Sequence, residues 1–144
     1  MVGSRDFFNE RQQREIAEEI KKAESQTSAE IRVHLEEHCD RDPFERAKEI
    51  FTKIGMHKTR LKNGILIYLC IKGKKFAIIG DAGIDKVLVP DYWGNLAAGI
   101  ERHFKEGGFC EGICFAIREL AGFLKKYFPH LKTDTNEIPD KLSF

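Results

Sequence analysis

The feature that most constrains the fold is an apolar run, Gly64 to Ile71, that contains no charged side chain. Its length is typical of a strand, and apolar residues at successive positions suit a strand that is covered on both faces. The Lys72–Lys74 segment that follows has the character of a hairpin turn, and Lys75–Gly80 is the expected partner strand. The chain therefore needs a sheet with a layer of structure on each side.

The segments around this run supply those layers. Apolar residues recur every three to four positions in Phe8–Ser25, where Asn9 stands in the N-cap position. Glu30–Glu36 alternates between apolar and polar residues, which predicts a strand. Further helical segments are expected over residues 43–54, 84–89, 90–104 and 109–128. This order predicts an α/β fold, a three-layer α/β/α sandwich with a small mixed β-sheet flanked by helices.

Composition predicts one intracellular domain. The 144 residues are 42% hydrophobic and 33% charged, which is enough to bury a core without a disulfide or a metal. We expect a single domain over residues 1–130 and a polar, loosely held C-terminal tail over residues 131–144. The four cysteines show no CxxC spacing, and residues 1–11 lack the apolar segment of a signal peptide. These features predict a soluble, cytoplasmic protein with reduced thiols and no membrane insertion.

Net charge bears on the partners. The formal charge is +1, which argues against nucleic acid or an anionic membrane as the main ligand. The charge is uneven, however, because residues 41–80 are strongly basic and the segments before and after them are acidic. The basic residues flank one strand at both of its ends, so they do not form a continuous stripe that could follow a phosphate backbone.

Two carboxylates follow the first predicted strand, in the loop His38–Asp42. Asp40 and Asp42 have DxD spacing, and ligands of open α/β sheets bind beyond the carboxyl ends of strands. Carboxylate oxygens are hard ligands that suit calcium or magnesium. The alternative is that Asp42 caps the following helix while Asp40 is solvated, and for this loop alone the alternative is favoured.

A second acidic segment, Gly80–Asp85, follows another predicted strand. Its two glycines let the backbone turn sharply, so that carbonyls and the carboxylates of Asp81 and Asp85 can converge on an ion. The alternative is an ordinary glycine-rich exit turn, which is slightly favoured. Asp91 is either a further oxygen ligand or another helix cap.

Strand pairing decides whether these acids meet. If the first strand lies parallel to and beside Gly64–Ile71, the two acidic segments lie at opposite ends of the sheet, roughly 26 Å apart and too far for one ion. If the first strand instead pairs parallel with Lys75–Gly80, Asp40, Asp42, Asp81 and Asp85 share one rim. The sequence leaves both arrangements open.

Other chemistry has weaker support. Cys39 stands near a helix N-terminus that could activate a thiol, but the adjacent His38 points away from it on an extended segment. Cys110 and Cys114 share a helix face without a second pair of metal ligands, which favours a place in the core. Ser/His/Asp catalysis has no G-x-S-x-G motif to support it. Catalytic residues are therefore unknown, and no organic cofactor is expected.

Segments spread over nearly the whole chain carry a family resemblance. They are 27–34 (TSAEIRVH), 39–43 with 46–47, 60–69 (RLKNGILIYL), 76–84 (FAIIGDAGI), 104–107, 128–129 and 136–140. In this combination the chain resembles the TPM domain family, also called TPM phosphatase, and looks like a stand-alone cytoplasmic member.

The resemblance implies an α/β/α sandwich that binds a divalent cation, often calcium, through acidic loop residues, and the family name attaches phosphatase activity. This chain reads Gly80–Asp85 where many members have a shorter Gly-Tyr-Gly-Leu-Glu. The metal ligands are therefore carried over to Asp42 and Asp81 first, and to Asp40 and Asp85 next.

The leading hypothesis is a calcium-binding TPM-domain protein that acts through binding or assembly, with the metal ion and a possible protein as its partners. The alternative is a metal-assisted phosphatase that hydrolyses phosphomonoesters, in which the ion activates water and Lys62 or Arg60 binds the phosphate. A third possibility is an interaction module without a metal.

Overall fold

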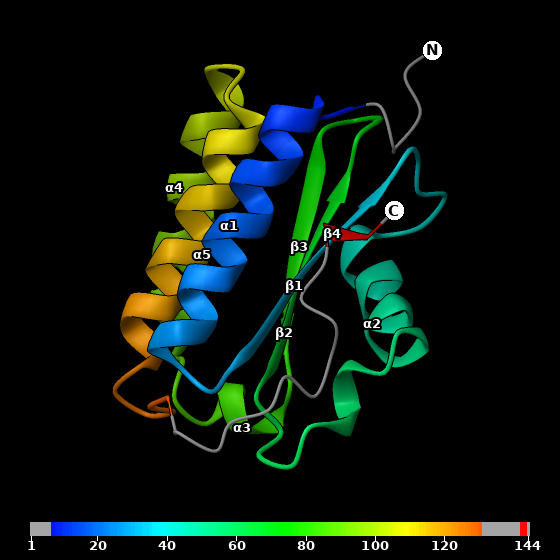
Figure 1. Cartoon of the computed structure of the whole chain (residues 1–144). Coiled ribbons are helices and arrows are strands. Elements are labelled where there is room, and N and C mark those ends of the chain that lie inside the picture. The colour runs from blue at the N-terminus through cyan, green and yellow to red at the C-terminus, as the bar shows by residue number, and fades with distance from the viewer. Residues whose placement is uncertain (1–6, 131–141, 144) are drawn as a thin grey trace.

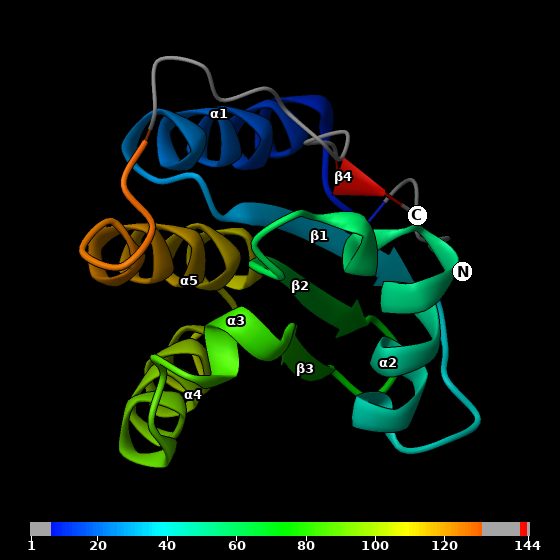
Figure 2. The same cartoon turned by 90° about the horizontal axis from the view of Figure 1, so that it is seen from below.

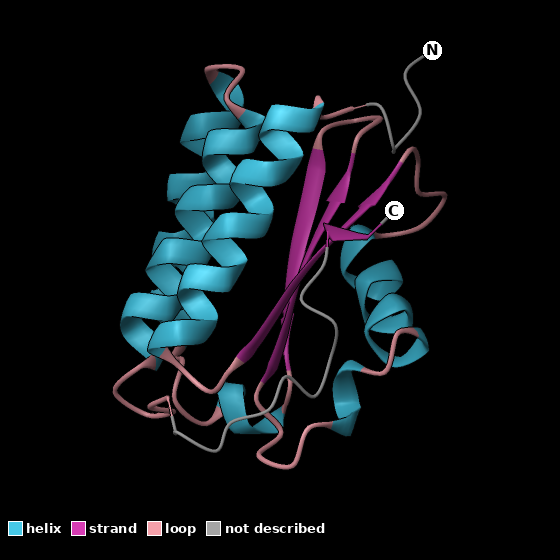
Figure 3. Ribbon diagram, in the orientation of Figure 1, coloured by secondary structure: helices cyan, strands magenta, loops and turns pink. Residues whose placement is uncertain are grey.

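A computed structural model describes residues 7–130 and 142–143. It shows a central sheet with helices on both faces, as the ribbon in Figure 1 and the secondary-structure colouring in Figure 3 make plain. The helices are α1 (Glu10–Gln26), α2 (Pro43–Lys53), α3 (Ala82–Asp85), α4 (Pro90–Lys105) and α5 (Phe109–Leu124), with a short 3-10 helix η2 (Met56–Lys58). The strands are β1 (Glu30–Glu36), β2 (Gly64–Cys70), β3 (Lys75–Gly80) and β4 (Leu142–Ser143).

The sheet is mixed and has the strand order β3-β2-β1-β4 among the described residues. β1 runs parallel to β2, with Glu30 opposite Gly64 and Glu36 opposite Cys70. β3 returns antiparallel to β2 through the hairpin, and β4 lies parallel to the middle of β1. The three-layer α/β/α sandwich with a small mixed sheet is thus confirmed. Of the two strand arrangements that the sequence leaves open, the fold adopts the one that pairs the first strand with Gly64–Cys70.

β2 separates two apolar cores, which explains why its sequence is apolar at every position. All seven of its residues are buried. Ile65, Ile67 and Leu69 belong to the core shared with α1, α4 and α5, whereas Leu66 and Tyr68 belong to the core beneath α2. Full burial of a large apolar side chain stabilises the fold by about 1.5–3 kcal/mol, so both faces of this strand contribute.

Local capping places the helices close to their predicted bounds. Asn9 and Gln12 form a reciprocal capping box at the start of α1, and Pro43 and Pro90 lie in the first turns of α2 and α4. The prediction of a helix over 84–89 is wrong in its bounds, because α3 begins at Ala82, where the Asp81 side chain caps the backbone N–H, and ends at Asp85. α5 likewise ends at Leu124 rather than at residue 128. No helix in the described part of the chain is long and apolar enough to cross a membrane.

Part of the predicted tail joins the sheet. Leu142 and Ser143 form β4, and the Ser143 Oγ lies 2.7 Å from Nδ1 of His34 on β1. Residues 131–141 and 144, which belong to the same predicted tail, lie outside the described residues. The sheet therefore extends beyond the segment that the sequence pattern assigns to it.

Candidate functional site

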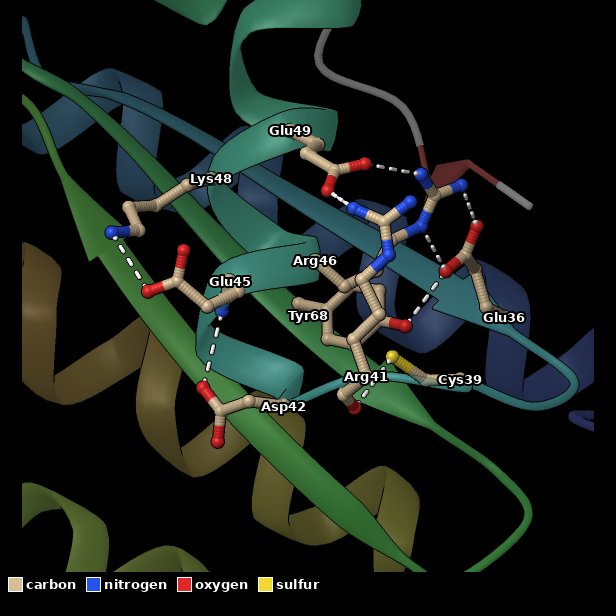
Figure 4. Close-up of polar contacts among 9 residues, drawn as sticks. All are labelled: Glu36, Cys39, Arg41, Asp42, Glu45, Arg46, Lys48, Glu49 and Tyr68. Carbon is tan, nitrogen blue, oxygen red and sulfur yellow. Dashed lines mark hydrogen bonds and ion pairs between the residues drawn. The ribbon is translucent and has the colours of Figure 1, made fainter.

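Asp40 and Asp42 lie beyond the carboxyl end of β1, and both are exposed. One Asp42 oxygen accepts a hydrogen bond from the backbone N–H of Glu45 at 3.2 Å, so Asp42 is the N-cap of α2 (Figure 4). The alternative prediction, that Asp42 caps the helix that follows it, is therefore confirmed. Among the described residues, this cap uses one Asp42 oxygen, Oδ2, and no hydrogen bond to the other oxygen is seen.

Asp81 and Asp85 lie at the other end of the sheet, in the turn after β3. Asp81 Oδ1 accepts from the Ala82 N–H at 2.7 Å, and Asp81 Oδ2 is buried with no hydrogen-bond partner among the described residues. Asp85 is exposed, but partial desolvation of its carboxylate and the nearby Asp81 carboxylate raise its pKa. These two carboxylates are brought together, which the sequence spacing alone could not guarantee.

The two acidic pairs do not share a site. β3 separates them, and its six residues span ~20 Å, several times the reach of ligands around one cation. Among residues 7–130 and 142–143, no group of three or more His, Cys, Asp or Glu side chains could hold a metal ion. Asp91 is not a helix cap, because Val89 occupies the N-cap position of α4 and Asp91 lies exposed in its first turn.

Backbone carbonyl oxygens lie close to Gly83, two residues after Asp81. Gly83 donates its N–H to the carbonyl of Lys62 at 2.8 Å, and a Cβ added at Gly83 would lie 2.5 Å from the Leu61 carbonyl oxygen. Lys62 has a positive φ of 52°, and its ammonium donates to the His57 carbonyl at 3.0 Å. Carboxylates and backbone carbonyls thus gather around one short turn.

Sequence reasoning missed a polar network beneath α2, drawn in Figure 4. Arg46 donates from Nε and Nη2 to the two Glu36 oxygens at 2.9 and 2.7 Å, and the Tyr68 hydroxyl donates to Glu36 at 2.7 Å. Burial would raise the pKa of Glu36, but the bonds from Arg46 and Tyr68 outweigh it and lower the pKa to about 2. In the sequence, this network is signalled only by Glu36 at the end of a predicted strand and by Arg46 on the helix that follows it.

This network holds α2 on the sheet. Arg46 also reaches Glu49 at 3.1 Å, and Arg41 from the acidic loop pairs with the same carboxylate. Burial raises the pKa of Tyr68, and its hydrogen bond to Glu36 raises it further, so the hydroxyl keeps its proton. The network therefore fixes the loop that carries Asp40 and Asp42 rather than offering a free acid or base.

His34 and the cysteines have structural surroundings. His34 is buried between Ser143 and Glu36, and burial lowers its pKa despite the Glu36 carboxylate 3.7 Å away. The Cys39 thiol donates to the Arg41 carbonyl at 3.2 Å. Cys110 and Cys114 are both buried in the larger core, where the sequence pattern favours them.

Comparison with known proteins places the chain in a family. The model of the TPM domain family matches residues 2–123, which is most of the chain. The chain belongs to the TPM domain family. The family membership that the sequence resemblance predicts is therefore confirmed.

Solved structures share this TPM fold. The NMR structure of the BA42 protein from the psychrophilic bacterium Bizionia argentinensis is 39% identical, with a TM-score of 0.89 over 95% of this chain and 94% of that one. The N-terminal domain of a protein from P. gingivalis is 15% identical, with a TM-score of 0.73 over 86% of this chain and 81% of that one, and it supports the fold alone. No curated protein is a significant match.

Proposed function

We propose that this TPM domain binds a divalent cation, calcium in the first place, at the turn after β3 and acts through binding or assembly. The observation that carries the proposal is the buried Asp81 Oδ2, which has no hydrogen-bond partner among the described residues. A buried, unpaired carboxylate oxygen is costly, and a bound cation removes that cost.

The neighbouring groups suit a hard cation. The raised pKa of Asp85 means that its ionised form is disfavoured beside Asp81, and a cation between them would reverse that effect. Calcium takes six to eight oxygen ligands, so backbone carbonyls and water would have to complete a shell that begins with two carboxylates. The Leu61 and Lys62 carbonyls, which lie against Gly83, are candidates for these ligands.

Asp40 and Asp42 form a separate, weaker candidate. Both are exposed, as Asp85 is, but neither has a buried oxygen without a hydrogen-bond partner among the described residues, which Asp81 does. We keep them as possible ligands of a second ion at the opposite end of the sheet, since one ion cannot reach both pairs. A cytoplasmic location and a protein partner remain predictions from the sequence.

The proposal is tested by titrating the protein with calcium and following its backbone amide signals by NMR. We expect the signals of Gly80–Asp85 to move and the Asp81→Asn variant to lose that response. Asparagine is also a good N-cap, so the variant keeps the start of α3. Asp91→Asn, which removes an exposed carboxylate from α4, is the control. Unmoved signals in this turn, or an unchanged response in Asp81→Asn, would refute the assignment.

The phosphatase alternative rests on the family name and has a direct assay. Hydrolysis of p-nitrophenyl phosphate would be measured from acid to alkaline pH with calcium, magnesium or manganese. Metal-dependent turnover that disappears in Asp81→Asn would replace the binding role with metal-assisted hydrolysis. The absence of turnover in a protein that binds calcium would leave the binding role in place.

A further inference from the structure

β3 is an open edge of the sheet. Within the described residues it pairs with β2 on one side and with no strand on the other. An edge strand presents unpaired backbone N–H and C=O groups, which are a template for an added strand. With six residues, β3 is long enough to pair with a short extended peptide.

This edge lies at the floor of a trough between α2 and α4, which Figure 2 shows on either side of β3. Two adjoining cavities of about 460 and 850 Å³ follow the strand, and Phe76 and Ala97 line both of them. Phe44 and Lys48 of α2 form one wall, and Trp93 of α4 forms the other. We call this feature the β3 trough.

Aromatic side chains supply much of the lining of the β3 trough at the Trp93 end, beside Lys48 and Asp85. The Phe76 ring packs edge-on against Phe104, with 5.5 Å between their centroids, and a Cβ at Gly80 would lie 3.6 Å from the Trp93 ring. Phe44 is 49% exposed, although it is a large apolar side chain. Exposed apolar surface beside an open strand is typical of sites that accept a peptide in extended conformation.

Charge is distributed unevenly along the β3 trough. At the hairpin end the lining includes Lys74, Lys75 and Lys105 together with Asp42 and Glu101. In the described part of the chain none of these three lysines forms an ion pair, although Lys74 lies 5.6 Å from the centroid of the Phe109 ring. The hairpin end is therefore the basic end and suits an acidic group.

A second copy of this chain fits the edge less well than a single peptide. Figure 2 shows α4 extending past the outer side of β3. In an antiparallel pairing of two β3 edges about a two-fold axis perpendicular to the sheet, the two α4 helices would lie on the same face and face each other across the seam. A lone extended segment avoids this contact, because it enters between α2 and α4.

We propose that the β3 trough binds an extended segment of a partner protein as an added strand. Its apolar side chains lie against Ile78 and Trp93, and its acidic residues lie at Lys74 and Lys75. Backbone pairing with β3 supplies the affinity, while the apolar trough and the lysines set which sequences are accepted. This inference does not depend on the cation site, although Asp85 lines the far end of the β3 trough.

The probe is a fluorescein-labelled hexapeptide, Ser-Val-Trp-Val-Asp-Asp, measured by anisotropy in the presence of EDTA. We expect saturable binding, with the amide signals of β3 gaining protection from hydrogen exchange. The same peptide with alternate backbone nitrogens methylated cannot complete the strand pairing, so it should not bind. Equal binding of the methylated peptide, or no binding of either, would overturn the proposal.

Two protein variants locate the site. Reversing both charges in Lys74→Glu/Lys75→Glu should weaken binding about tenfold, whereas the matched Lys125→Glu/Lys126→Glu variant at the end of α5 should bind as the natural sequence does. Ala97→Trp fills the β3 trough and should abolish binding while its thermal unfolding confirms the fold. Unchanged binding in either trough variant contradicts the proposal, as does a peptide-free dimer whose β3 amides are already protected.

The cation site is tested separately by Asp81→Asn, which should bind the peptide normally in EDTA. If the peptide binds Asp81→Asn but not Ala97→Trp, the result supports peptide binding in the β3 trough, regardless of whether the protein binds calcium. A failure of calcium binding therefore leaves this result unaffected.

Discussion

The Glu36 carboxylate accepts two hydrogen bonds from Arg46 and one from Tyr68, and these bonds hold it ionised far below the usual range. Its role is to connect three elements rather than to react. The contrast with Asp81 is informative, because one oxygen of that carboxylate is buried and unpaired. A satisfied carboxylate fixes structure, and an unsatisfied one is a candidate for a ligand.

Stability should fall on acidification partly through Glu36. Its pKa is about 2 in the folded protein against a reference of 4.5, so its contribution is complete above about pH 5 and is lost as pH falls toward 2. Glu36→Gln should cost about 2 kcal/mol at pH 7 and should flatten this part of the pH profile. Urea unfolding at a series of pH values measures both effects. An unchanged slope between pH 5 and 2 would show that Glu36 is not the titrating group.

The network around Glu36 was beyond prediction for a physical reason. Arg46 is 10 residues from Glu36 in sequence and Tyr68 is 32, so their contact exists only once β1 and β2 pair and α2 crosses the sheet. The cap at Asp42 was predictable because it needs only the backbone three residues ahead. The proximity of Asp81 and Asp85 was partly predictable, because the two residues are close in sequence but approach each other only when the helical turn of α3 forms.

At the scale of helices and strands, periodicity and capping located the elements but not the order of the strands. Either parallel partner was compatible with the alternating pattern of Glu30–Glu36, because pairing depends on contacts between distant segments. The pairing with β2 is the arrangement that places the two acidic pairs at opposite ends. β4 was not predicted, because a strand of two residues in a polar segment is too short to show the alternating pattern of a strand.

The turn between β3 and α3 depends on a close backbone approach. A Cβ at Gly83 would lie 2.5 Å from the Leu61 carbonyl and 2.6 Å from that of Lys62, and neither backbone can move freely. Gly83→Ala should therefore destabilise the protein by about 1–3 kcal/mol, measured by urea unfolding.

Gly94 provides a matched control within α4. Nothing lies within 4 Å of a Cβ built there, so Gly94→Ala should stabilise by about 0.5–1 kcal/mol through helix propensity. The two substitutions make the same chemical change in helices and should have opposite signs. If Gly83→Ala proved neutral, the close approach would not exist in solution.

At the scale of the whole molecule, the proposed cation site and the proposed peptide site both lie along the open edge of the sheet. The Asp81–Asp85 turn lies at one end of β3, the basic hairpin lies at the other, and the β3 trough connects them. A ligand bound only by the folded state stabilises the whole domain. Calcium binding and peptide binding should therefore both appear as shifts in global unfolding.

Calcium at 100 times its dissociation constant should raise the free energy of unfolding by about 2.7 kcal/mol, because the unfolded chain lacks the turn. Asp81→Asn should show no such gain, and Asp91→Asn should show the full gain. Differential scanning calorimetry with calcium or EDTA provides the measurement. Equal stabilisation of all three proteins would indicate a site elsewhere.

The two cores on either side of β2 have a consequence for how changes combine. Leu66 and Ile67 are neighbours in the chain, yet their side chains belong to separate cores, so truncating both should cost nearly the sum of the separate costs. His34 and Ser143 are 109 residues apart, yet they share a hydrogen bond and should not be additive. Whether two substitutions have additive effects on stability thus depends on whether their side chains share a face of the sheet. Their separation along the chain is a poor guide.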